Sequence, residues 1–158
     1  MAGIVPTSIE FELPDGWQAA PPDEVRAPDA AFVALFPHPD HGYTPTITVN
    51  DESGSGSLTD LADDAVAALK DAGAVVVVIK RTEVGSVDAP GLVQLLAIVV
   101  AIDGTTFDLV QSQVYMSLVD GPELVVLRLV LTASSGQYTE LMADFQDFVD
   151  TVRLEPAG

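Results

Sequence analysis

The sequence predicts an α+β protein in which two main helices pack on one antiparallel β-sheet of about six to seven strands. Most segments alternate apolar and polar side chains and end at proline, glycine or aspartate, which is the pattern of strands joined by turns. Two longer segments instead repeat apolar side chains every three or four residues, as amphipathic helices do. The expected order is β-β-β-α-β-β-β-β-α. We interpret residues 1–158 as a single domain with its core at about 8–154.

Three strands are expected before the first helix. Residues 8–13 alternate apolar and polar side chains and are followed by the turn sequence Pro-Asp-Gly. Residues 31–36 form a short apolar run, and residues 44–52 follow after two prolines. The proline-rich stretch between the first two segments is expected to be a loop.

Each helix has a recognisable beginning. Ser57 is a suitable N-cap with Asp60 three positions later, and Gly73 is well placed to end the first helix. Ser134, with Gln137 three positions later, is expected to begin a last helix of about 17 residues. The apolar stripe of this helix predicts a core-facing side; it consists of Tyr138, Leu141, Met142, Phe145, Phe148, Val149 and Val152.

Four further strands are expected at 74–84, 92–102, 105–119 and 123–133. The second of these is apolar on both faces, which favours a central strand covered on each side. Asp-Gly dipeptides at 103–104 and 120–121 predict tight hairpins between the last three strands.

Composition excludes several classes of function. The chain carries 24 acidic and 6 basic residues, a net charge of −18, which opposes binding to nucleic acid and to anionic membrane surfaces. It has no cysteine, which excludes disulfides, thiol catalysis and iron–sulfur clusters. The longest apolar run, residues 95–102, is far shorter than the roughly 20 residues of a membrane helix, and the N-terminus does not resemble a signal peptide. We therefore expect a soluble, cytoplasmic protein without membrane insertion.

One stretch raises the question of a metal. His38, Asp40 and His41 supply ligand types that suit zinc or nickel. Pro37 and Pro39 hold the segment extended, so neighbouring side chains point apart, and we interpret the stretch as a solvated loop before a strand. No Gly-x-Ser-x-Gly elbow or phosphate-binding loop is present, and we expect neither a cofactor nor catalysis.

Two surfaces are candidates for binding. Glu140, Asp144 and Asp147 form an acidic face on the last helix, which is either a docking face for a basic partner or a solvated surface.

The second candidate lies on the strand 105–119, where Gln111, Gln113, Tyr115 and Ser117 alternate on one side. These side chains either line a groove or form an exposed sheet surface, and the spacing favours the exposed surface.

Three segments give the chain a family resemblance. "FELPDGW" near the start, "GYTPTITVNDES" before the first helix and "LTASSGQYTELMADFQDFVDTVRL" at the end resemble the PsbP-like superfamily, and within it the actinobacterial LpqN/LpqT-like group. The resemblance covers about residues 8–154 and implies an antiparallel sheet between helices. It also implies an accessory or binding protein without catalytic residues.

Our leading interpretation is a non-catalytic protein-interaction protein from an actinobacterium, with a homodimer as one possible assembly. The alternative is a small-molecule or lipid-binding module with a pocket between sheet and helix. A metal-dependent enzyme at His38, Asp40 and His41 comes third.

Overall fold

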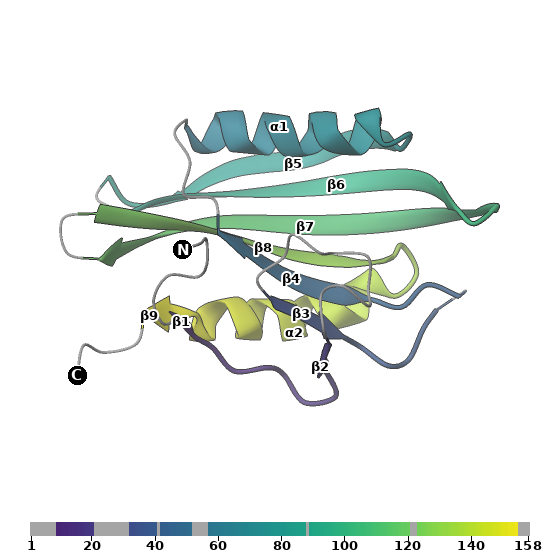
Figure 1. Ribbon diagram of the computed structural model, residues 1–158, viewed down its shortest axis with the longest axis horizontal. Helices are drawn as coiled ribbons and strands as arrows, with labels where there is room; N and C mark the ends of the chain where they lie inside the picture. The colour runs from purple at the N-terminus through teal and green to yellow at the C-terminus, as the bar shows by residue number, and fades with distance from the viewer. Residues whose placement is uncertain are drawn as a thin grey trace.

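A computed structural model describes residues 9–20, 32–40, 42–51, 57–87, 89–120 and 123–154. Its centre is one antiparallel sheet of seven strands in the order β2-β3-β4-β8-β7-β6-β5 (Figure 1). These strands are β2 (Gln18–Ala20), β3 (Phe32–Leu35), β4 (Thr46–Asp51), β5 (Val75–Gly85), β6 (Pro90–Ile102), β7 (Thr105–Asp120) and β8 (Glu123–Ser134). The two helices are α1 (Leu58–Asp71) and α2 (Tyr138–Thr151). The predicted α+β class and the two helices are confirmed.

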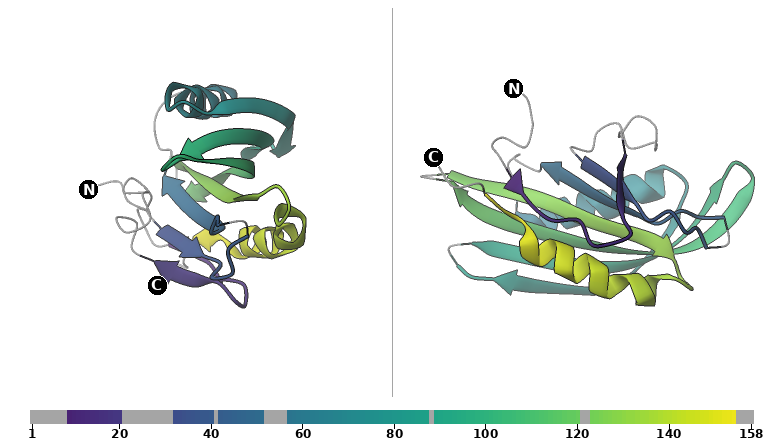
Figure 2. Two further views of the ribbon diagram at one scale, coloured as in Figure 1. Left: turned by 90° about the vertical axis from the view of Figure 1, so that its right-hand side faces the viewer. Right: turned by 90° about the horizontal axis from the view of Figure 1, so that it is seen from below.

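The helices cover opposite faces and opposite halves of the sheet. Helix α1 packs over β5 and β6, whereas α2 packs under β8 on the other face (Figures 1 and 2). The larger core lies between α2 and the sheet, where Phe145 and Phe148 contact apolar side chains of β4 and β8. The apolar stripe predicted for the last helix is confirmed, because its members are buried or partly buried in this core.

Local signals at α1 act as predicted. The Ser57 side chain accepts a hydrogen bond from the Asp60 N–H at 3.0 Å, and the Asp60 carboxylate accepts one from the Ser57 N–H, which completes a capping box. Gly73 follows the helix with φ +101°, a left-handed conformation that glycine adopts without strain. Asp103 and Gly104 also have positive φ and form the two-residue turn between β6 and β7. The second predicted turn, at 120–121, extends outside the described residues.

Several expectations at the ends of the chain are wrong. Of the described residues 9–13 in the predicted first strand, only β1 (Ile9–Glu10) is a strand, and it pairs with β9 (Arg153–Leu154) outside the main sheet. Helix α2 begins at Tyr138 rather than after Ser134, because Ser134 continues β8 and residues 135–137 form a turn. The Ser134 hydroxyl accepts a hydrogen bond from the Gln137 N–H within that turn, so the capping-type contact exists without starting the helix.

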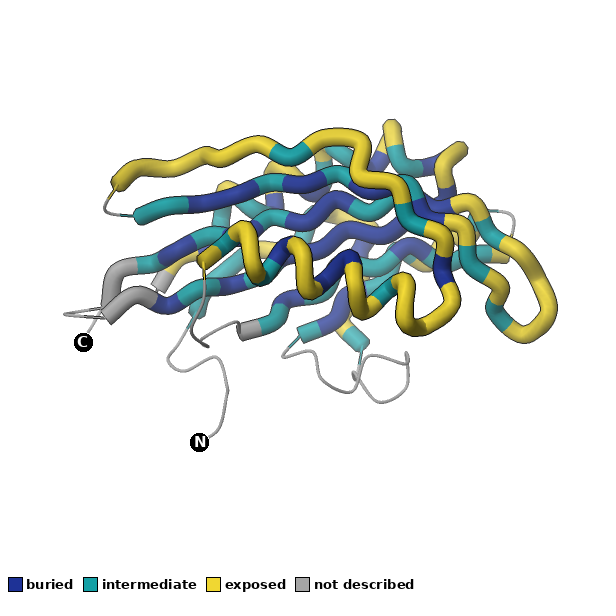
Figure 3. Tube along the Cα trace, turned by 90° about the horizontal axis from the view of Figure 1, so that it is seen from above, coloured by how far each residue is buried: buried dark blue, intermediate teal, exposed yellow. Residues whose placement is uncertain are grey.

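The position of β6 also differs from expectation. It lies next to the edge of the sheet, beside β5, and is not central. Helix α1 covers its one face, where Leu96 and Ile98 are buried, whereas Val99 on the other face is exposed. The described residues therefore leave part of the apolar second face of β6 uncovered. Figure 3 shows that β5, the neighbouring edge strand, is exposed along nearly its whole length.

Candidate functional site

A chain of polar side chains crosses the face of the sheet under α1. Arg81 on β5 donates to Gln94 Oε1 on β6, Gln94 donates to Gln113 Oε1 on β7 at 2.6 Å, and Gln113 donates to Gln111 Oε1 at 2.5 Å. Gln111 then donates to the Thr132 hydroxyl on β8 at 3.0 Å. We call these five side chains the amide ladder. Gln94 and Gln113 are almost completely buried, so their amides depend on one another for hydrogen bonds.

The direction of the amide ladder is fixed at its first residue. A guanidinium group has donors and no acceptor, so Gln94 must present its oxygen to Arg81 and its NH₂ group to the next residue. The Gln94 NH₂ group also donates to the Ala62 carbonyl of α1 at 3.2 Å. Each following amide is then oriented in the same sense, and the Tyr115 hydroxyl adds a second donor to Gln113 Oε1 at 3.0 Å.

The amide ladder ends in a groove between α1 and the strands β4, β7 and β8. The groove has a volume of about 930 Å³. The sheet side of the groove carries hydroxyl and amide groups, its α1 wall is apolar, and Tyr43 and Phe107 also line it with their ring centroids 5.6 Å apart. Thr44, Thr46, Thr48, Gln111, Gln113, Arg128 and Thr132 are its polar residues. We call this the α1 groove.

Tyr43 remains a neutral hydrogen-bonding group in this groove. Burial raises the pKa of Tyr43 to about 12, and a hydrogen bond with Thr46 acts in the opposite direction. The phenol is therefore protonated throughout the physiological pH range, and no negative charge forms on it in the groove.

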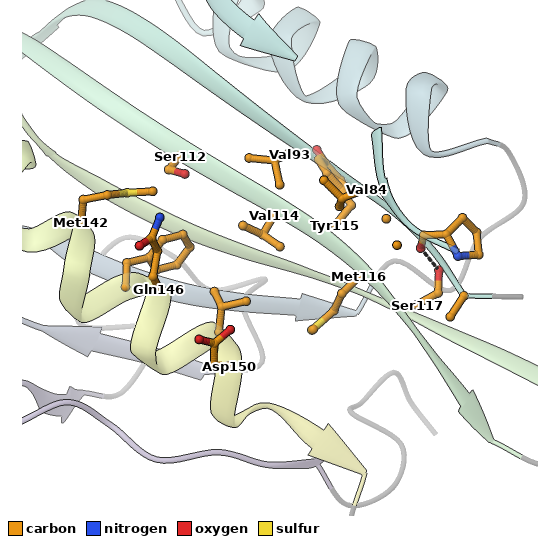
Figure 4. A pocket seen from close by; sticks show the side chains of 16 residues that line it. Val84, Val93, Ser112, Val114, Tyr115, Met116, Ser117, Met142, Gln146 and Asp150 are labelled. Carbon is orange, nitrogen blue, oxygen red and sulfur yellow. Dashed lines mark hydrogen bonds between the residues drawn. The ribbon is translucent and has the colours of Figure 1, made fainter. Parts of the chain in front are cut away.

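The opposite face of the sheet carries a second hollow. It is a pocket of about 490 Å³ between α2 and the strands β5, β6 and β7. Figure 4 shows Met142, Gln146 and Asp150 of α2 facing Val93, Val114 and Met116 of the sheet across it. The pocket is mainly apolar, with polar groups at its rim.

Strand pairing shows that this pocket belongs to a larger apolar surface. One row of paired residues runs Leu129–Val114–Val93–Thr82, and the next runs Leu131–Ser112–Leu95–Lys80. Each row begins in the core under α2 and continues beyond the helix to the edge at β5. We call the hollow between α2 and β5 on this face the apolar trough; its apolar side chains are Val75, Val77, Val84, Val93, Leu95, Ala97, Val99, Val114, Met116, Met142 and Val149, and the polar side chains Lys80 and Thr82 lie among them on β5.

The apolar trough is open to solvent at its outer side. Val75 and Val77 on β5 are 63% and 58% exposed, and Val84 is 44% exposed. Seen from below, α2 crosses the sheet beside β5 and β6 without covering them (Figure 2, right). Large contiguous exposed apolar surfaces are uncommon on soluble proteins and mark sites of interaction.

The three acidic residues predicted on α2 do not share one environment. Glu140 and Asp147 are exposed. Asp144 is half-buried and accepts a hydrogen bond from Trp17 Nε1 at 3.1 Å. Asp144 therefore holds the N-terminal segment against α2, and Glu140 and Asp147 are the two that face solvent.

In the structure, His38 and Asp40 of the candidate metal-binding stretch have different surroundings. His38 is exposed, its ring lies 5.1 Å from that of Phe36, and its carbonyl accepts from the Gln137 side chain at 2.9 Å. The Asp40 carboxylate accepts from the Ser134 hydroxyl at 2.5 Å. His41 lies outside the described residues. Within the described ranges, no group of three His, Cys, Asp or Glu side chains is arranged to hold a metal ion.

The predicted groove residues are brought together, but not as a solvent-exposed sheet face. Gln113 and Tyr115 are buried because α1 lies over them, and the Tyr115 hydroxyl lies 3.4 Å from the Leu61 carbonyl. Gln111 and Gln113 line the α1 groove, whereas Tyr115 packs against Leu58 and Leu61 of α1. The favoured interpretation as an exposed sheet surface is wrong for Gln113 and Tyr115.

Sequence reasoning missed the apolar trough and the roles of Arg81 and Gln94. A signal for the trough was present, because residues 92–102 are apolar on both faces although only one helix is available for each face. No comparable signal marked Gln94, since a single glutamine within an apolar strand does not reveal its partners.

Comparisons with solved structures identify the fold. CyanoP, the PsbP protein of the cyanobacterium Synechocystis, superposes with a TM-score of 0.59 at 10% identity over 98% of this chain and 91% of its own. LpqN of Mycobacterium tuberculosis, which is involved in cell envelope biogenesis, gives 0.54 at 18% identity over 96% and 86%. This chain has the PsbP-like fold. The predicted fold resemblance is thus confirmed.

The same fold occurs in a protein that binds another protein. The Ran-binding protein Mog1p of Saccharomyces cerevisiae matches the PsbP-like fold of this chain with a TM-score of 0.59 at 12% identity, over 97% of this chain and 93% of its own. No protein-family model and no curated protein sequence matches the chain. In the described part of the chain, neither helix is long and apolar enough to cross a membrane.

Proposed function

We propose that this protein is a non-catalytic binding protein that docks a partner protein on the apolar trough. The observation that carries the proposal is the row-by-row continuation of the α2 core onto a sheet face that no described element covers. Burying such a surface is favourable by roughly 25 cal/mol per Å² of apolar area, which makes it a strong attachment point for a complementary surface. The binding of Ran by a protein of the same fold is consistent with this class of function.

The charges around the apolar trough indicate the chemistry of the partner. Asp150 lies at its rim, Asp147 and Glu140 are exposed on the outer side of the same helix, and the exposed Lys80 lies at the β5 edge. Together with the net charge of −18, these carboxylates favour a partner whose apolar centre is flanked by lysine or arginine. A second copy of this chain would bring the same acidic rim, so we favour a different, basic protein.

Two exposed valines allow a controlled test. Val77→Glu places a carboxylate in the apolar trough, and Val87→Glu makes the same change at a 98% exposed position in the β5–β6 turn, outside the trough. Both variants should fold, because both side chains are largely exposed. We expect a host-cell protein to be retained by the wild type and by Val87→Glu, and to be lost from Val77→Glu.

The acidic rim is tested separately by Glu140→Lys with Asp147→Lys, leaving Asp144 unchanged because it binds Trp17. We expect weaker retention of the partner and a smaller dependence on salt. Equal retention by wild type and Val77→Glu, or no retained protein at all, contradicts the proposal. Light scattering of the purified protein distinguishes a homodimer, because concentration-dependent dimerisation abolished by Val77→Glu would assign the apolar trough to a second copy.

Two further parts of the proposal have direct tests. Turnover of any substrate that is lost on His38→Ala would contradict the non-catalytic assignment. Fractionation of the native host tests the expected cytoplasmic location.

A further inference from the structure

The amide ladder contains an asymmetry that the packing of α1 does not require. Every donor in it points from Arg81 towards β8, and the last acceptor is the Thr132 hydroxyl. That oxygen accepts from Gln111, so its own proton remains available to donate. Thr132 is only 8% exposed and lines the α1 groove, and among the hydrogen bonds of the described residues it takes part as the acceptor from Gln111.

A hydrogen-bond chain with a cation at its donating end polarises each following group. Arg81 is such a cation, and its second contact, with Asp63 at 2.7 Å, lies on the side away from Gln94. The Thr132 hydroxyl is consequently a stronger donor than an isolated threonine hydroxyl. Because a buried donor without an acceptor is unfavourable, the end of the ladder fits a ligand oxygen in the α1 groove.

We infer that the α1 groove binds a neutral, hydroxyl-rich small molecule of about monosaccharide to disaccharide size, with one ligand oxygen accepting from Thr132. The volume of about 930 Å³ lies within the range of small-molecule sites, roughly 300 to 1,000 Å³. Thr46 and Thr48 supply further hydroxyls on the sheet side of the groove. Hydroxyl groups both donate and accept, so several of them match a ligand that does the same.

The charge of the protein argues for a neutral ligand. Among the described residues lining the α1 groove, none is acidic and Arg128 is the one basic residue; Arg128 already has an interaction partner within the protein. The net charge of −18 nevertheless opposes an anion that approaches from solution. The apolar wall formed by Leu69 and neighbouring alanines of α1, together with the ring of Tyr43, suits the carbon face of a sugar.

Nuclear magnetic resonance of the intact protein tests this site without the partner. The probes are neutral sugars (glucose, galactose, mannose, ribose, sucrose and maltose), each at about 10 mM, which detects a Kd of about 1 mM. We expect at least one sugar to shift the side-chain NH₂ signals of Gln111 and Gln113. Sodium benzoate at the same concentration is the anionic comparison and should leave these signals unchanged.

Two kinds of variant locate the contact. Thr132→Val removes the hydroxyl while keeping the shape, and should weaken sugar binding about tenfold, whereas Thr139→Val on the exposed side of α2 should not change it. Arg81→Met lies outside the α1 groove and should weaken binding about twofold to threefold, with Arg81→Lys restoring part of the loss. Arg81 would then be a positioning residue that acts through the ladder.

The inference is overturned if none of the sugars shifts the Gln111 and Gln113 signals, or if Thr132→Val binds a sugar as tightly as the wild type. If Thr132→Val proves unfolded by its spectrum, the Arg81 pair decides, and equal affinity in Arg81→Met and wild type overturns the role of the ladder. Neither result depends on whether a protein docks on the opposite face, so the two proposals fail independently.

Discussion

Replacing Gln94 by leucine tests whether the amide ladder stabilises the fold. Gln94 is fully buried and makes four hydrogen bonds, two from Arg81 at 2.8 and 3.0 Å, one to the Ala62 carbonyl and one to Gln113. Leucine has a similar volume, so the change removes the hydrogen bonds with little change in packing.

The expected loss follows from what each partner retains. Arg81 keeps Asp63 and is partly exposed, so water replaces some of its lost contacts. Gln113 keeps the Tyr115 hydroxyl as a donor to its oxygen. Each lost hydrogen bond costs about 1 kcal/mol net, and somewhat more where the donor is charged. The leucine side chain returns a small part of this through its apolar burial. We therefore expect the free energy of unfolding to fall by about 2 to 4 kcal/mol. For a chain of this length, the corresponding fall in Tm is roughly 4 to 16 °C.

Urea denaturation followed by circular dichroism measures the loss, with an unchanged m-value showing that the same surface is exposed on unfolding. Gln18→Leu, at an exposed position of β2, is the matched control and should change stability by less than about 0.5 kcal/mol. The double change Gln94→Leu with Gln113→Leu should cost less than the sum of the two single changes, because the first already removes a bond of the second. A loss below about 0.5 kcal/mol for Gln94→Leu, or strict additivity, would show that the amide ladder does not stabilise the fold.

Three further predictions concern single positions. Burial raises the pKa of Tyr43 to about 12, so the phenol loses its proton at lower pH in the unfolded chain than in the folded protein. The free energy of unfolding should therefore fall by about 2 to 3 kcal/mol between pH 10 and 12. In alkaline denaturation curves, Tyr43→Phe should remove this part of the fall in stability. In thermal denaturation, Gly85→Ala should lower the free energy of unfolding by roughly 2 to 4 kcal/mol, because φ is +83° and a Cβ would lie 2.5 Å from a backbone oxygen. A loss below about 1 kcal/mol would contradict this. In urea denaturation, Asp144→Ala should lower the free energy of unfolding by about 1 to 2 kcal/mol, because Trp17 Nε1 then lacks its acceptor. Asp147→Ala, at an exposed position, should leave the stability unchanged. Equal effects of the two changes would argue against an anchoring role of Asp144.

Signals within a few residues of one another were sufficient for most of the strands and helices. The capping box at Ser57 and the Asp103–Gly104 hairpin depend on backbone conformations that only a few residue types favour, so the sequence determines them directly. The alternation of Val125, Leu127 and Leu129 against Arg128 likewise assigned each side chain to its face of β8. These patterns, with the family resemblance, were enough to predict the PsbP-like fold.

The binding surfaces were decided by the tertiary structure. Whether the second apolar face of β6 is core or open surface depends on where α2 lies across the sheet, and Val93 and Leu95 look the same in sequence in either case. The amide ladder joins Arg81, Gln94 and Thr132 from three strands through register, which is a long-range property set by strand order and by the bulge near Val78. Local sequence therefore determined which elements form, whereas the order of strands and the placement of two helices on a larger sheet determined which surfaces remain free to bind.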